Sequence, residues 1–166
     1  MAGMITQLVE IMTEQSERYN ELLGLSIEEK EILVSNDIEE LQKLTNLKNM
    51  VITQNNRLEK KRISLVNDIA EVMGSTEKDI DLSKLIEIMG EQPESEQLIE
   101  LGKNLKETLD KLKEANTLNK QLLEASIEYV EYSLNVMRSS TNPESPEFPD
   151  RGNRGEDVYG SFDTTQ

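Results

Sequence analysis

The chain has 166 residues with a net charge of -15, and 36% of them are hydrophobic, 4% aromatic and 31% charged. So few large apolar side chains suit helices joined along narrow seams better than a compact sandwich or doubly wound fold, and the negative charge disfavours nucleic acid and anionic membranes as partners. The absence of histidine and cysteine removes the commonest general base and any disulfide or thiolate metal chemistry.

The first half of the chain is predicted to form two long helices. Apolar residues recur at steps of three and four between residues 4 and 34, which indicates a first helix. The polar sequence Ser35-Asn36-Asp37 then supplies side-chain oxygens that can cap a second helix, from about residue 37 to 73. In that second helix every seventh residue is apolar: Leu44, Val51, Leu58, Leu65 and Val72. This spacing is typical of coiled-coil packing, so we expect an antiparallel hairpin with a tight turn near residue 35.

The second half is predicted to hold a connector and a third long helix. Gly74 ends the second helix, and one short apolar helix is expected between Glu77 and Pro93. The third helix is expected from about residue 94 to 138, and the leucines of its first half form a narrow seam. Beyond Asn116 two apolar stripes appear, which is more apolar surface than one partner helix needs. Either two helices of the same chain cover these stripes, or they form a groove for a helix of another protein.

The predicted fold is therefore all-α: an elongated antiparallel helical bundle or coiled coil of three long helices with a short connector helix. We place the helical domain at residues 1–138, because apolar periodicity stops after Arg138 and Pro and Gly become frequent. Residues 139–166 are expected to form a disordered, acidic tail rich in Pro and Gly. Its isolated aromatic residues are candidate docking anchors, with an inert tail as the alternative. They are Phe148, Tyr159 and Phe162.

The sequence contains no constellation of residues that predicts catalysis or metal binding. It has no glycine-rich phosphate loop or nucleophile elbow, and the segment 79–83 carries only the first three ligand positions of a calcium-binding loop. We therefore expect a protein that is not an enzyme and has no catalytic residues, metal site or cofactor. The amino end lacks a basic start, and no apolar run approaches the roughly 20 residues that span a bilayer. A cytoplasmic protein without membrane insertion is expected.

Several stretches resemble the FlgN family of flagellar export chaperones. The stretch Glu29–Leu41 reads EKEILVSNDIEEL. Together with Leu44 and Lys48, which follow it, this stretch resembles the first hairpin of that family. The sequences LNKQLL and YVEYSL of the third helix resemble the carboxy-terminal helix of the family, and Tyr159-Gly160 resembles the tyrosine-glycine of its tail. The resemblance covers roughly residues 1–138 and this one point in the tail. The Pro-rich segment 143–146 has no counterpart in it.

The resemblance implies a cytosolic chaperone of flagellar type III export. Its clients would be the hook-filament junction proteins, bound through their C-terminal helices and delivered to the export gate, and no cofactor would be needed. As a hypothesis, the client-binding residues are Leu122, Leu123, Ile127, Tyr129, Val130, Tyr132, Leu134 and Met137. The tail aromatics Phe148, Tyr159 and Phe162 either dock on the export gate or fold back over the client groove when no client is bound. The alternative is a self-associating coiled-coil scaffold or adaptor without an exported client. A homodimer is compatible with either function.

Overall fold

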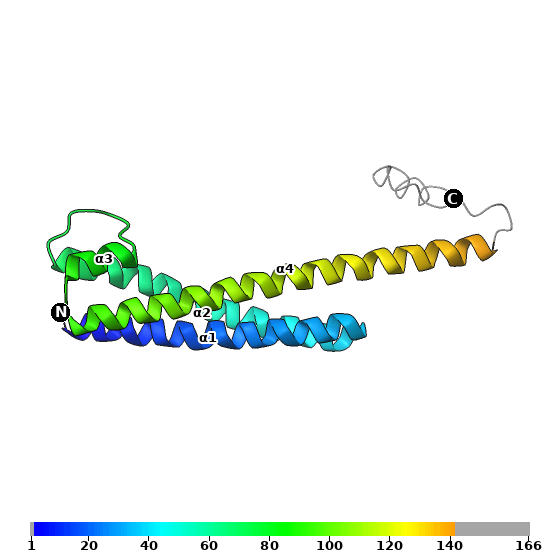
Figure 1. Ribbon diagram of the computed structural model, residues 1–166, viewed down its shortest axis with the longest axis horizontal. Helices are drawn as coiled ribbons and strands as arrows, with labels where there is room; N and C mark the ends of the chain where they lie inside the picture. Colours follow the sequence, from blue (N-terminus) through cyan, green and yellow to red (C-terminus); the bar gives the residue numbers. More distant parts are fainter. Residues whose placement is uncertain (1, 142–166) are drawn as a thin grey trace. The chain divides into compact units, whose positions relative to one another are not determined.

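The computed structural model describes residues 2–141, and every regular element in that range is a helix. The helices are α1 (Ala2–Ser35), α2 (Ile38–Val72), α3 (Leu82–Met89) and α4 (Pro93–Thr141), shown in Figure 1. Three long helices and one short connector helix match the prediction, so the all-α class is confirmed. The chain divides into two units, residues 1–126 and residues 127–166, which are described separately below.

The connection between α1 and α2 is the tight turn that the sequence predicts. Asn36 adopts a left-handed backbone with a φ of 56°, a conformation that asparagine tolerates better than most side chains. Asp37 caps α2, because its carboxylate accepts a hydrogen bond of 3.1 Å from the backbone N–H of Glu40. Two short polar residues therefore reverse the chain and let α1 and α2 lie side by side (Figure 1).

The main hydrophobic core of the first unit is formed by side chains from α1, α2, the α2–α3 connection, α3 and the start of α4. Its buried members are Ile5, Leu8, Ile11, Met12, Leu58, Leu65, Val66, Ile69, Ala70, Ile80, Leu85, Met89 and Leu98. Four of the five residues at sevenfold spacing in α2 are buried in the first unit, whereas Val72 is 59% exposed. Val72 is the last residue of α2, and the core at this end is closed by Ile69 and Ala70 instead.

Helix α3 is short but sharply bounded. Asp81 caps it, because its carboxylate accepts a hydrogen bond of 2.8 Å from the backbone N–H of Lys84. Gly90 ends it with a φ of 69°, which a residue with a side chain rarely adopts. Leu85 and Met89 lie one turn apart on the same face and are buried in the main core. The connector therefore packs on the bundle as part of it.

Helix α4 contacts the α1–α2 hairpin within the first unit. At its start, Leu98 is fully buried in the main core. Apart from the main core, one small apolar cluster joins the three long helices through Leu22, Val51 and Leu112. The middle of α4 is therefore held by few apolar side chains, and its polar contacts contribute to its attachment to the hairpin.

Candidate functional site

All eight predicted client-binding residues lie on the carboxy-terminal part of α4. Leu122 is half-buried and Leu123 is exposed, and both belong to the first unit. The other six belong to the second unit, and each exposes between 47% and 69% of its surface. They are Ile127, Tyr129, Val130, Tyr132, Leu134 and Met137. The described part of the second unit is one helical segment, so no other described element of that unit covers them. Their binding role remains a prediction.

These exposed side chains occupy much of the circumference of the segment. Successive residues in an α-helix are rotated by about 100°. One stripe consists of Ile127, Val130, Leu134 and Met137, and the other consists of Tyr129, Tyr132 and Val136. Val136 is not among the predicted client-binding residues, although it is 47% exposed and shares the stripe of the two tyrosines. A helix that is apolar around so much of its surface is normally contacted on more than one side.

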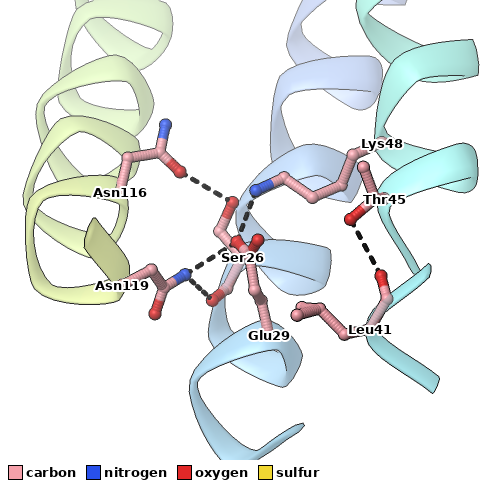
Figure 2. Close-up of polar contacts among 7 residues, drawn as sticks. All are labelled: Ser26, Glu29, Leu41, Thr45, Lys48, Asn116 and Asn119. Carbon is pink, nitrogen blue, oxygen red and sulfur yellow. Dashed lines mark hydrogen bonds and ion pairs between the residues drawn. The ribbon is translucent and has the colours of Figure 1, made fainter. Parts of the chain in front are cut away.

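A polar network holds the middle of α4 on the hairpin, as Figure 2 shows. Asn119 Nδ2 donates hydrogen bonds to the backbone oxygen of Ser26 at 2.7 Å and to Glu29 Oε2 at 2.9 Å. The same Glu29 oxygen accepts a 2.5 Å hydrogen bond from Lys48 Nζ, and the Ser26 hydroxyl donates to Asn116 Oδ1 at 3.2 Å. Glu29 therefore joins all three long helices through one carboxylate. Glu29 and Lys48 both belong to the residues that carry the family resemblance.

A second polar layer joins α1 and α2. Glu59 Oε2 accepts hydrogen bonds from Gln15 Nε2 at 2.8 Å and from Arg62 Nε at 2.9 Å, and Glu59 Oε1 accepts one from Arg62 Nη2 at 2.6 Å. The hydrogen bonds from Arg62 lower the pKa of Glu59 although burial acts in the opposite direction. Burial and, to a smaller extent, the Glu59 carboxylate raise the pKa of Tyr19. Glu59 is thus an ionised carboxylate that accepts three hydrogen bonds from two side chains, which suits a structural role.

Neither a candidate metal site nor a helix able to span a membrane is found among residues 2–141. Among residues 2–141 no group of three or more Asp and Glu side chains is placed to hold a metal ion. Asp81, which lies in the incomplete calcium-loop pattern of segment 79–83, caps α3. No helix in the same range is long and apolar enough to cross a membrane.

The predicted tail lies almost wholly beyond the part of the chain that the structure describes. Its first three residues, 139–141, form the last turn of α4, so the helix ends three residues later than predicted. The three candidate docking aromatics lie outside the described residues. They are Phe148, Tyr159 and Phe162. The predicted domain boundary after residue 138 falls within α4, and the division into a helical domain and a tail stays a prediction.

Comparison with known proteins identifies one family. A family model described as FlgN protein matches residues 1–147, which include every residue that the structure describes. Comparison with curated proteins gave no match, and neither did comparison with solved structures. The Tyr159-Gly160 pair lies beyond the matched residues.

Proposed function

The chain belongs to the FlgN family of flagellar export chaperones, and from this premise we propose that it binds the C-terminal helices of hook-filament junction proteins in the cytosol before their export. The resemblance inferred from the sequence is thus confirmed at the level of the family. The choice of client, the binding residues and delivery to the export gate are the parts that we propose. The observation that supports client binding is the run of exposed apolar side chains between Ile127 and Met137.

The proposed client explains why a helix should keep apolar side chains in water. Amphipathic helices with exposed apolar faces tend to associate with one another, and a chaperone suppresses this by offering a complementary apolar surface. Tyr129 and Tyr132 are 69% and 53% exposed and suit the role of anchors, because an aromatic ring contributes a large contact area at low entropic cost. A client that covers both stripes contacts the segment on more than one side.

The energy available from this surface is substantial but limited. Seven apolar side chains of the second unit are each about half exposed. Covering the exposed half of one such side chain contributes ~1 kcal/mol, so all seven contribute about 7 kcal/mol, and a client that buries a comparable apolar area contributes about as much again. Association costs on the order of 4–15 kcal/mol, and a micromolar complex requires about 8 kcal/mol net. Burial of this surface can therefore supply a large part of the affinity of such a complex.

A double substitution tests whether this surface binds the client. Val130→Asp with Leu134→Asp places two charges in the aliphatic stripe, and we expect it to abolish binding of a junction-protein C-terminal fragment in calorimetry. Both side chains are exposed, so the circular dichroism of the helices should not change. A matched control, Gln121→Glu with Asn135→Asp, adds the same charge at exposed polar positions of α4 and should bind normally. Full binding by the first variant would refute the assignment of the surface.

The main alternative, a self-associating scaffold, uses the same exposed stripes in a different way. In that case the surface between Ile127 and Met137 would be covered by a second copy of the chain. Sedimentation velocity distinguishes the two functions. A chaperone whose stripes are free for a client should sediment with the same mass before and after the Val130→Asp and Leu134→Asp changes. A scaffold should form dimers or larger assemblies that these changes dissociate.

A further inference from the structure

One sevenfold series of residues runs through α4 from the first unit into the second without a break. Its members in the first unit are all buried or half-buried, and we call this series the α4 seam. They are Leu98, Leu105, Leu112, Asn119 and Ser126. In the second unit the seam continues with Ser133 and Ser140, where no other described element of that unit is present to cover it. Because α4 is one helix as far as Thr141, the seam extends a packing face that is already in use.

In the first unit the α4 seam packs against two helices at once. Leu112 belongs to one apolar cluster with Leu22 of α1 and Val51 of α2. The next seam residue, Asn119, donates a hydrogen bond of 2.9 Å to Glu29 of α1, and the same carboxylate oxygen accepts a hydrogen bond from α2. The partner of this face is therefore a pair of helices and not a single helix.

The edges of the face change where the second unit begins. We define the edges as the residues directly after and directly before each seam residue, which lie about 100° to either side of it. One edge reads Lys106, Lys113, Lys120, Ile127 and Leu134. The other edge reads Asn104, Lys111, Leu118, Ala125 and Tyr132. Polar residues thus give way to apolar ones on both edges, so the apolar face of the second unit is wider than the face that holds two helices in the first.

The width of this face decides how many helices it can hold. A single partner helix needs only a narrow apolar seam, and apolar residues at both flanking positions indicate contact with more than one helix. The side of the segment opposite Ser133 is polar, because Glu131 and Asn135 lie about 160° from it and are exposed. The apolar face is therefore bounded, and its size suits two helices lying side by side.

We propose that residues 127–141 of α4 bind a pair of amphipathic helices of the exported client, in the way that the α1–α2 hairpin packs on the first unit's part of the α4 seam. This inference rests on the proposed chaperone function and specifies how the client is held. One client helix packs over Val130 and Leu134, and the other packs over Tyr129 and Tyr132. The two meet above Ser133, whose small side chain leaves space for large apolar side chains of the client.

Substitutions on the two edges distinguish a helix pair from a single helix. Leu134→Ala and Tyr132→Ala remove side chains that are 47% and 53% exposed and lie on opposite edges. A helix pair covers both edges, so each substitution should weaken binding of a junction-protein C-terminal fragment by at least about fivefold in calorimetry. The matched control, Asn135→Ala on the polar side of the same segment, should leave the affinity unchanged. Loss of affinity at one edge only, or at neither, would overturn the proposal.

Designed peptides separate failure of the two-helix surface from failure of the chaperone function. If neither junction-protein fragment binds the wild-type chain, the proposed function is wrong. The surface is then judged with a designed hairpin of two leucine-rich amphipathic helices and with each of its helices alone. Tighter binding of the hairpin, weakened by Leu134→Ala and also by Tyr132→Ala, would support the two-helix surface. No binding of the hairpin, equally tight binding of a single helix, or sensitivity to one edge only would overturn it.

Discussion

Replacing Glu29 is expected to weaken the attachment of α4 to the hairpin more than any other single polar substitution in the network of Figure 2. Glu29 Oε2 accepts hydrogen bonds from Lys48 Nζ on α2 and from Asn119 Nδ2 on α4. The side chains of Glu29 and Lys48 are only 17% and 15% exposed, so neither group is well solvated once the other is gone. Glu29→Ala thus leaves the largely buried Lys48 ammonium without its acceptor and removes one of the two acceptors of the Asn119 amide.

The cost follows from the burial of the two groups. Breaking a fully buried ion pair costs about 3–5 kcal/mol, and an exposed pair contributes under about 1 kcal/mol. For this partly buried pair we expect Glu29→Ala to lower the free energy of unfolding by about 2–3 kcal/mol. Glu29→Ala with Lys48→Met should recover ~1 kcal/mol of that loss, because it removes the charge that Glu29→Ala leaves unpaired.

Urea unfolding followed by circular dichroism measures these changes, and a double-substitution cycle with Lys48→Met isolates the coupling between the two side chains. Glu31→Ala is the matched control, because Glu31 is an exposed glutamate of the same helix and has no ion pair with the described residues. A loss below about 0.5 kcal/mol for Glu29→Ala, or additive effects of the two substitutions, would refute the reasoning.

Three further predictions concern other parts of the chain. Asn55 is 3% exposed, and neither its amide oxygen nor its amide nitrogen has a hydrogen-bonding partner among residues 2–141. Asn55→Leu should therefore raise the free energy of unfolding by ~1 kcal/mol, measured by urea titration. A loss of stability would contradict this prediction. The pKa of Glu59 is lowered below its ordinary value of 4.5, so its contribution to stability is complete above that pH and is lost as the pH falls through the lowered pKa. The difference in unfolding free energy between wild type and Glu59→Gln should therefore shrink below pH 4.5, and a constant difference would be inconsistent with the Arg62 contact. A chain ending at Thr141 should keep its affinity for the client and lose binding to the export gate in pull-down assays; unchanged gate binding would exclude the tail as a docking segment.

Much of the fold could be predicted because its determinants are local. The short polar side chains of Asn36 and Asp37 dictate a turn and a cap, and the sevenfold apolar spacing of α2 identifies its buried face. The end of α4 was misplaced because Ser139 and Thr141 are poor helix formers on average. Their hydroxyls donate hydrogen bonds to backbone oxygens one turn earlier, including those of Val136 and Met137, and the helix continues through them.

The parts that escaped prediction depend on pairings between distant residues. Glu29 contacts Lys48 and Asn119 because α1, α2 and α4 are aligned so that these three residues lie side by side. The residue spacing within one helix does not predict how the three helices are aligned with one another. Sequence periodicity located the apolar residues between Ile127 and Met137, and the structure adds that their side chains are exposed.

Calorimetric titration of the purified chain with C-terminal fragments of the hook-filament junction proteins tests the central claim most directly. The account predicts one-to-one binding of micromolar or tighter affinity to at least one fragment, with a negative heat-capacity change that reflects burial of the apolar stripes. Absence of binding to either fragment, under conditions in which the chain sediments as a dimer or larger assembly, would contradict it and favour the self-associating scaffold.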